Sequence, residues 1–279
     1  MKKIFIILAM LLFTVGNCFA KCEYNCVEPY DLSNGFSRFM STVTGSRALG
    51  NTVAQSILKK QIAKNIEGKL DVDIKSYSVK DLKKGIFKSI TIKGKNVDLD
   101  GVAFTSIKMQ TLCKFNYISF EKEPVFKEDL PIAFYVELTQ DDLNKTMQTE
   151  NYKRIISDVN RLGGSVFKVV SSRINIHDDK LYYILKVAVP FVRKTQNIVL
   201  ESDLKVSHGE IDFANTRLVN GGISLKNIDK VINFLNPLDF SLNILENKNA
   251  DLAVENVKIN GNKIIADGII LISKDDYER

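Results

Sequence analysis

The fold prediction rests on the stretch Ser46–Glu67, which reads SRALGNTVAQSILKKQIAKNIE. Apolar side chains recur in it at helical spacing, and polar side chains such as Gln55 and Lys59 fall between them. The spacing predicts one long amphipathic helix, and Gly68 stands where a glycine would end it. The apolar stripe consists of Val53, Ala54, Ile57, Leu58, Ile62 and Ile66.

From Asp71 onward, much of the chain alternates apolar and polar residues, as half-buried strands do. Consecutive runs are joined by short turns, which favours a mainly antiparallel sheet, and no βαβα alternation is present. The sequence therefore predicts an α+β fold, in which a strongly curved sheet wraps around the long helix. The expected strands cover residues 72–77, 86–93, 97–101, 102–120, 132–138, 166–176, 181–189, 198–206, 211–219, 252–259 and 263–273.

Two shorter helical regions are expected to interrupt the strands. Thr139 suits the N-cap of a helix over 140–148, and a second apolar stripe follows over 152–162. The other helical region covers 225–235 and ends near Pro237. After it, Phe240, Leu242 and Ile244 alternate, which predicts one more strand.

The first residues read as an export signal. Lys2 and Lys3 precede the apolar run Ile4–Val15, and cleavage is expected after Ala20. An uncleaved anchor and lipoprotein processing at Cys18 are the alternatives. The expected organisation is a signal peptide over 1–20, an irregular cysteine-containing arm over 21–45, a single domain over 46–273 and a polar tail over 274–279. The expected location is the periplasm or cell envelope.

Three cysteines remain after that cleavage. Cys22 and Cys26 are close enough in sequence to form a small disulfide-closed loop, and the odd count leaves one thiol over within a monomer. Free surface thiols are the other interpretation. The spacing of Cys22 and Cys26 is not the CxxC of redox proteins, and no second close pair suggests zinc, so no metal site is predicted.

Charge and composition exclude several function classes. The formal net charge is +6, with Lys2 and Lys3 contributing part of it, and the remaining lysines are scattered. A nucleic-acid surface would be more basic, whereas anionic lipid headgroups are a milder fit and solvated lysines are the default. His177 and His208 fall in expected turns, and no nucleophile elbow, metalloprotease helix or phosphate-binding loop is present. We therefore expect no enzymatic activity and no cofactor.

Three segments carry a resemblance to a known family. The run Gly85–Val97, the segment Leu138–Asn144 and the closing segment Val257–Gly268 resemble, in pattern and order, the LmeA-like family of exported phospholipid-binding proteins. The resemblance covers roughly residues 46–273 and leaves out the arm. It implies a tubular lipid-binding (TULIP-like) fold, with a helix in a bent antiparallel sheet around an apolar groove. It also implies phospholipid binding or transfer at envelope membranes.

Two functions follow as expectations. The first is a lipid carrier that buries acyl chains and touches membrane surfaces transiently, and the second is a structural or adaptor module with a dry core and a protein partner. Sequence patterns do not distinguish a filled core from an open groove. The residues expected to line the groove are Val53, Ile57, Leu58, Ile62, Ile66, Phe134 and Val136.

Overall fold

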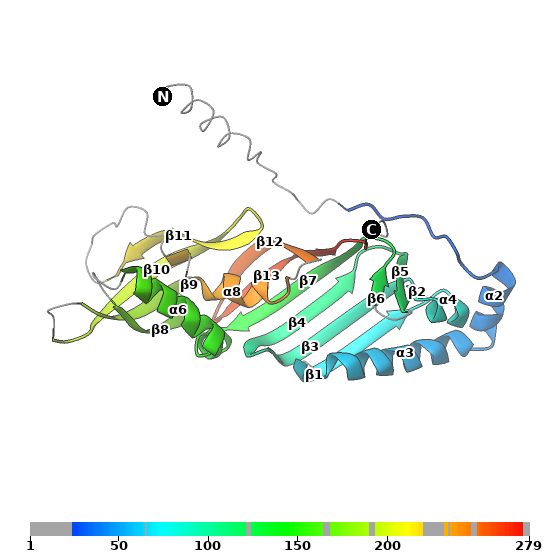
Figure 1. The fold of residues 1–279 in the computed structure, drawn as a ribbon, viewed down its shortest axis with the longest axis horizontal. Coiled ribbons are helices and arrows are strands. Elements are labelled where there is room, and N and C mark those ends of the chain that lie inside the picture. The colour runs from blue at the N-terminus through cyan, green and yellow to red at the C-terminus, as the bar shows by residue number, and fades with distance from the viewer. Residues whose placement is uncertain are drawn as a thin grey trace, which may run out of the picture.

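The computed structural model shows an elongated molecule, with helix α2 at one end and strands β8 to β11 at the other (Figure 1). It describes residues 24–64, 66–120, 124–163, 168–189, 193–219, 232–233, 235–246 and 250–275. The expected signal peptide, Cys22, most of the helix expected over 225–235 and the end of the tail lie outside the described residues. Among the described helices, none has the length and apolar character needed to span a membrane.

The largest layer is a six-stranded sheet in which every pair of neighbours is antiparallel. Strands close in sequence form most of it. The two C-terminal strands form a hairpin, as their alternating pattern predicted, and this hairpin joins the sheet beside β7. The strand order is β1 (Ile66–Lys75), β3 (Ser89–Leu99), β4 (Val102–Thr111), β7 (Leu130–Thr139), β13 (Lys263–Ile272) and β12 (Ala250–Asn260).

The described residues form two smaller antiparallel sheets as well. One has the order β11 (Glu210–Leu218), β10 (Gln196–Ser207), β9 (Lys180–Ala188) and β8 (Lys168–His177). The other consists of β2 (Ile86–Phe87), β5 (Asn116–Phe120) and β6 (Pro124–Phe126). The α+β class and the antiparallel pairing predicted from sequence are therefore confirmed. A backbone hydrogen bond of 2.7 Å, from the N–H of Val254 to the carbonyl of Gly209, joins the six-stranded and four-stranded sheets.

The described residues form six helices: α2 (Gly35–Val43), α3 (Ser46–Ile62), α4 (Val79–Lys83), α5 (Gln140–Thr146), α6 (Glu150–Gly163) and α8 (Pro237–Asn243). Thr139 is the N-cap of α5, as predicted. Its hydroxyl accepts from the Asp142 N–H at 3.2 Å, while its own N–H donates to the Asp142 carboxylate at 2.8 Å. This reciprocal capping box satisfies backbone donors at the point where β7 becomes a helix.

The long helix is shorter than its sequence pattern predicted. It ends at Ile62, and Ile66 opens β1, where it pairs with Leu99 of β3. Gly68 is not a helix cap but lies at a bulge of β1 with a φ of +129°. A Cβ at this position would stand 2.6 Å from the Asn96 carbonyl oxygen, so only glycine fits. Sheet pairing with β3 replaces what would have been the last helical turn.

Two further expectations were wrong. The arm over 21–45 is not wholly irregular, because it contains α2, whose N-cap Asn34 accepts from the Ser37 N–H at 2.8 Å. The alternation of Phe240, Leu242 and Ile244 belongs to helix α8 and its C-cap rather than to a strand. Asn236 caps that helix and Pro237 opens it, which are the usual helix-start signals.

The main core lies around two buried tyrosines. The hydroxyls of Tyr152 on α6 and Tyr183 on β9 are 2.9 Å apart, and the Tyr152 hydroxyl donates to the Leu235 carbonyl at 2.6 Å. Burial raises the pKa of Tyr183 to about 12, so this hydroxyl stays neutral at physiological pH. The phenols thus bring α6, β9 and the chain before α8 together without burying a charge.

Candidate apolar binding surface

One face of the six-stranded sheet is apolar from its β1 edge to β13. The register places Val72 opposite Ile92, Ile92 opposite Met109, and Met109 opposite Phe134. Residues directly opposite one another in a ladder project on the same side of the sheet. A neighbouring row brings Leu70, Gly94, Ile107, Val136 and Ala266 together in the same way.

Burial along this face is uneven. Phe134 and Val136 on β7 are 2% and 0% exposed and belong to the main core. Four other side chains of this face remain only half-buried although their three strands, β3, β4 and β7, all lie inside the sheet: Ile90, Ile92, Met109 and Ile132. We call these four residues the apolar strip. Large apolar side chains on interior strands are usually covered completely, so the partial exposure of the strip makes it the candidate position for an apolar ligand.

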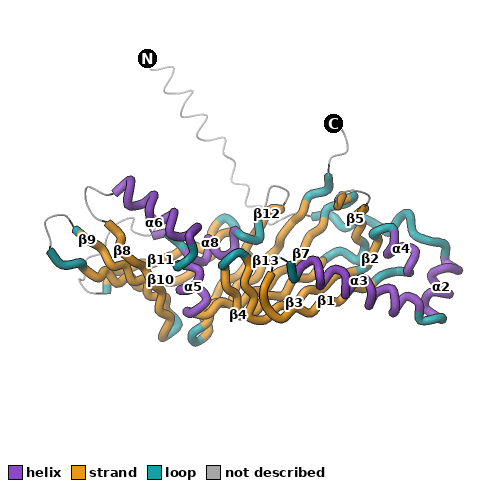
Figure 2. Tube along the Cα trace, turned by 60° about the horizontal axis from the view of Figure 1, so that its bottom comes forward, coloured by secondary structure: helices purple, strands orange, loops and turns teal. Residues whose placement is uncertain are grey.

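Helix α3 lies along β1 at this side of the sheet (Figure 2). Its inward side chains, Ala54, Leu58 and Ile62, pack against a buried cluster that includes Val72 and Ile74 of β1, and Ile90, Ile92 and Ile132 pack against the same cluster. All three inward residues are half-buried, and no residue of α3 is fully buried. Helix α3 and three of the four strip residues therefore pack against one buried cluster of the sheet.

The predicted lining residues do not all meet at this place. Leu58 and Ile62 pack against the same buried cluster as Ile90, Ile92 and Ile132, and their place in a groove wall stays a prediction. Val53 and Ile57 are 60% and 58% exposed on the outer side of α3, so their placement in the groove wall was wrong. Successive helical residues differ by about 100° in direction, and a stripe that includes 53, 54, 57 and 58 covers more than one face.

The other three predicted lining residues lie in the sheet. Ile66 is a half-buried residue of β1 that packs against the main core. Phe134 and Val136 are covered by protein, so they form core rather than an open wall. Strand alternation identified the apolar face correctly. The burial of each residue on that face depends on what packs over its strand. The sequence therefore did not single out the strip residues Ile90, Ile92 and Met109.

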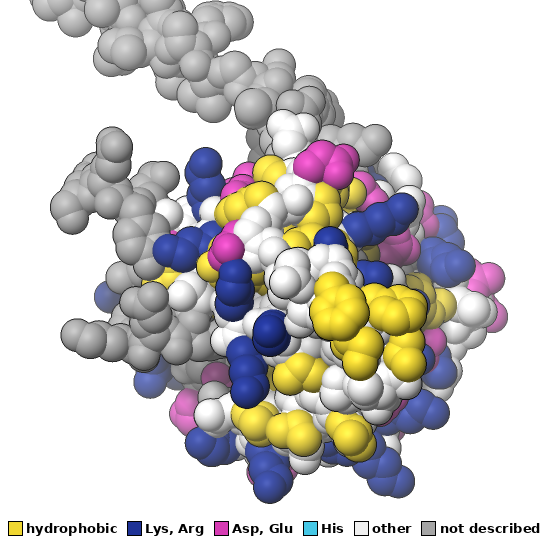
Figure 3. Space-filling view, turned by 90° about the vertical axis from the view of Figure 1, so that its right-hand side faces the viewer, with side chains coloured by type: hydrophobic (Ala, Val, Ile, Leu, Met, Phe, Trp, Pro, Cys, Tyr) yellow, Lys and Arg dark blue, Asp and Glu magenta, His cyan; other side chains and the backbone are white. Residues whose placement is uncertain are grey.

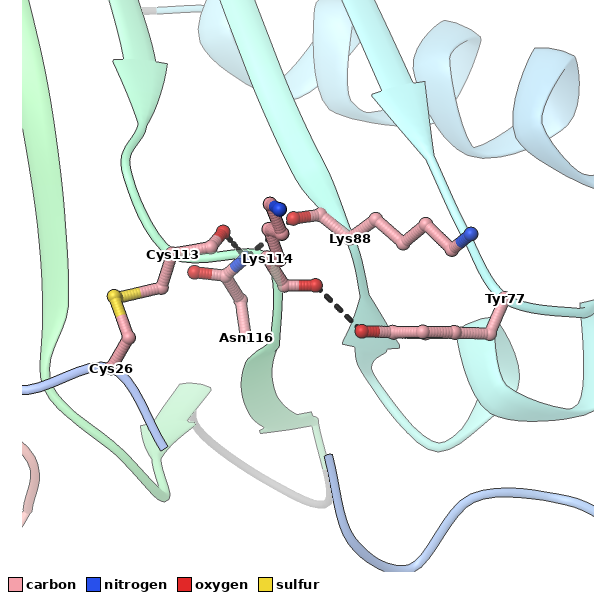
Figure 4. The surroundings of a disulfide bond; sticks show 6 residues. All are labelled: Cys26, Tyr77, Lys88, Cys113, Lys114 and Asn116. Carbon is pink, nitrogen blue, oxygen red and sulfur yellow. Dashed lines mark hydrogen bonds between the residues drawn. A yellow bond between two sulfur atoms is a disulfide. The ribbon is translucent and has the colours of Figure 1, made fainter. Parts of the chain in front are cut away.

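A disulfide lies just beyond the end of β4, at the same end of the strands as the strip. Cys26 in the arm is bonded to Cys113 in the connection between β4 and β5 (Figure 4). The predicted Cys22–Cys26 pair is therefore wrong. The partners are separated by 87 residues, and sequence proximity favoured the nearer cysteine because connectivity is not encoded in spacing.

A cavity of about 760 Å³ opens between the arm and this connection. In Figure 4, the Tyr77 hydroxyl donates to the Lys114 carbonyl at 2.6 Å, and the Lys88 ammonium lies 4.9 Å from the centre of the Tyr77 ring. The Asn116 amide donates to the carbonyls of Cys113 and Lys88. Burial raises the pKa of Tyr77, so its phenol remains a donor at neutral pH.

The described residues hold no group of three His, Cys, Asp or Glu side chains that could bind a metal ion. His177 is an exposed residue at the β8–β9 turn, stacked on Tyr182 with ring centres 4.0 Å apart. His208 lies in the β10–β11 turn, where its ring is 3.0 Å from the Ser207 hydroxyl. Both histidines thus occupy the turn positions expected from sequence.

Comparison with known proteins places the chain in no family. No protein-family model, no curated protein and no solved structure matches it. The resemblance to LmeA-like proteins therefore stays a hypothesis, and the geometry of the apolar face has to support any function by itself.

Proposed function

We propose that this protein is an exported lipid-binding protein of the cell envelope, which holds a phospholipid acyl chain on the apolar strip beside α3 and carries it between membranes. The observation that supports this function is the incomplete burial of Ile90, Ile92 and Met109 on interior strands. Leu58 and Ile62 of α3 pack against the same buried cluster as Ile90 and Ile92. In this proposal the sheet curves around α3 to form a TULIP-like groove.

The energetics suit an acyl ligand. Each methylene that leaves water contributes about 0.8 kcal/mol, so a stretch of ten methylenes contributes roughly 8 kcal/mol before the costs of association. Aliphatic side chains such as Ile92 and Leu58 offer contact without hydrogen-bond direction, which fits a chain that has no polar atoms. The expected export would bring the protein to membranes that supply such lipids.

Native mass spectrometry tests the proposal directly. The protein would be purified without detergent from a bacterial host that exports it. We expect adducts of phospholipid mass, with their identity established by solvent extraction. A mass without adducts that persists after incubation with phospholipid vesicles would contradict lipid binding.

A matched pair of substitutions on α3 locates the ligand. Ile62→Asp places a charge beside the strip, whereas Ile57→Asp places the same charge on the exposed side of the same helix. With monomeric short-chain phospholipid as the probe, we expect Ile62→Asp to lose the adduct and Ile57→Asp to keep it. Far-ultraviolet circular dichroism of both variants shows whether each is folded. Equal loading of folded Ile62→Asp and Ile57→Asp would place the lipid elsewhere.

The alternative is an envelope adaptor with a filled core. The complete burial of Phe134 and Val136 favours it, because these residues were expected in the groove wall and are core instead. An adaptor would show no lipid in mass spectrometry and would retain one stoichiometric protein partner when isolated from its native envelope.

A further inference from the structure

Helix α2 turns its apolar side to solvent. Phe36, Phe39 and Val43 are 73%, 62% and 64% exposed, and Met40 lies on the same side at 38%. Their spacing is that of a single helical face. The side turned toward the protein is polar instead, and the buried residue of α2 is Ser41, whose hydroxyl accepts from the Val79 N–H at 3.4 Å.

Helix α3 extends this exposed surface. Leu49, Val53 and Ile57, spaced four residues apart, are 70%, 60% and 58% exposed on its outer side. We call the seven exposed residues of the two helices the apolar tip. Figure 3 shows hydrophobic side chains gathered on this end of the molecule, with lysine and arginine side chains around them. The apolar tip consists of Phe36, Phe39, Met40, Val43, Leu49, Val53 and Ile57.

The apolar tip is held in place rather than folded back over the protein. Just before α2, the N–H and hydroxyl of Ser33 donate to the buried Asp81 carboxylate at 2.6 and 2.9 Å. Further upstream, the Cys26–Cys113 disulfide ties the arm to the β4–β5 connection. With polar anchors on its inner side, α2 has no inward apolar face to bury, so its outward apolar face needs a partner outside the described fold.

The charges around the apolar tip identify that partner. From Leu32 to Ile66 the sequence contains no Asp or Glu but five cations: Arg38, Arg47, Lys59, Lys60 and Lys64. Lys59, Lys60 and Lys64 are exposed at the end of α3, and Lys80 of α4 lines a shallow pocket together with Phe36 and Met40. Asp73 of β1 lies beside α3, where its exposed carboxylate accepts from the Gln55 amide at 3.1 Å. A basic rim around an exposed aromatic face matches an anionic bilayer surface.

We propose that the apolar tip docks on an anionic membrane, with α2 lying in the interface, Phe36 and Phe39 at the headgroup–acyl boundary and the basic side chains on phosphates. This docking does not depend on lipid binding by the strip. It adds a reason for that site, because the inner side of α3 borders the strip while its outer side meets the membrane.

The absence of tryptophan from the chain allows a clean test. Phe39→Trp puts a single indole on the apolar tip, and Val170→Trp puts one on an exposed apolar position of β8, where Val170 is 51% exposed. The probe is vesicles of phosphatidylcholine with about one-third phosphatidylglycerol. We expect emission of Phe39→Trp to shift to the blue and to be quenched by brominated lipid, and emission of Val170→Trp to stay unchanged.

Vesicle flotation gives the affinity. We expect Phe36→Ser/Phe39→Ser to bind the anionic vesicles about tenfold more weakly than the unmodified protein, and Val170→Ser/Val219→Ser to bind as the unmodified protein does. Binding should weaken with salt and on pure phosphatidylcholine, because the basic rim supplies part of the attraction. Equal flotation of the two double variants would overturn the proposal.

Other occupants give different outcomes. Blue-shifted Phe39→Trp emission before vesicles are added would show that protein already covers the apolar tip, and a dimer that Phe36→Ser/Phe39→Ser dissociates would assign the face to a second copy. Either result overturns the membrane proposal. Flotation without phospholipid adducts would support the docking surface and contradict the carrier function. Adducts without flotation would support the carrier function and contradict the docking surface.

Discussion

Helices α2 and α6 carry the same pattern and use it in opposite ways. Their apolar residues have identical spacing, with Phe36, Phe39, Met40 and Val43 in α2 and Tyr152, Ile155, Ile156 and Val159 in α6. In α6, Tyr152 is fully buried and the other three pack against the main core. In α2, all four are exposed. A helical period therefore identifies a face, and the surrounding fold decides whether protein covers it.

The polar residues of the two helices also differ. In α6 they mix both signs, and Glu150 pairs with Lys153 at 2.8 Å, as on an ordinary solvated face. In α2 they are serine, threonine and arginine without any acid, and several of them face the protein. A helix whose apolar stripe lies opposite serine, threonine and arginine side chains, with no acidic residue, is therefore a candidate docking helix.

The largest expected effect comes from equivalent truncations in the two stripes. Tyr152→Ala removes a buried ring and should lower the free energy of unfolding by about 3–5 kcal/mol. Phe39→Ala removes an exposed ring and should change it by less than about 0.5 kcal/mol. Urea denaturation followed by circular dichroism measures both. Tyr152→Phe, which loses only the buried hydroxyl, should fall between them at about 1–2 kcal/mol. Similar destabilisation by both alanine variants would show that α2 is packed in solution.

A smaller effect tests how the α2 end is held. Replacing both Cys26 and Cys113 with serine should lower the free energy of unfolding by about 2–4 kcal/mol, because the bond closes a long loop of the unfolded chain. Adding reductant to the unmodified protein should give the same loss and leave the double variant unchanged. If reductant has no effect on the unmodified protein, the arm is not held by this bond.

The smallest effect concerns a carboxyl group at the core, on α8, whereas the apolar tip has no acidic residue. Burial, and then repulsion from Glu210 on β11, together raise the pKa of Asp239, in the first turn of α8, to about 6. A folded-state pKa above the unfolded value of about 4 means that stability falls as pH rises from about 4 to 6. Asp239→Asn should remove this fall and gain about 1 kcal/mol at pH 7, an amount discounted for partial exposure.

Thermal unfolding at pH 7 and pH 4 measures this difference. At pH 4, Asp239 and its asparagine replacement should have nearly equal melting temperatures, since the folded carboxyl is then protonated. A gain of equal size at both pH values would trace the effect to packing instead of charge.

Local signals predicted local structure well. The hairpin that pairs His177 with Lys180 and the one that pairs Asn260 with Lys263 both lie at the expected turns, since a hairpin needs only neighbouring residues. Thr139 was a correct helix start for the same reason. The antiparallel character of the sheets followed from these short connections.

Features that depend on distant residues were not predicted. The end of α3 is set by pairing of Ile66 with Leu99, and Cys26 finds its partner 87 residues away. At the candidate site, helical spacing placed Leu58 and Ile62 on the inward side of α3, where both are half-buried. The partial burial of Met109 and the outward direction of Ile57 depend on how α3 sits on the sheet, which no single-chain pattern records.

The edge strand β1 has a consequence for self-association. Its outer backbone groups could recruit a strand from another molecule, and the exposed apolar tip would bring molecules together. Its solvent-facing side chains are Glu67, Lys69, Asp71, Asp73 and Lys75, all charged and exposed, and the bulge at Gly68 interrupts the regular ladder. An incoming strand would meet these charges and a broken register. The molecule can thus expose the apolar tip on α2 and α3 while the charges and the bulge of β1 oppose strand pairing between molecules.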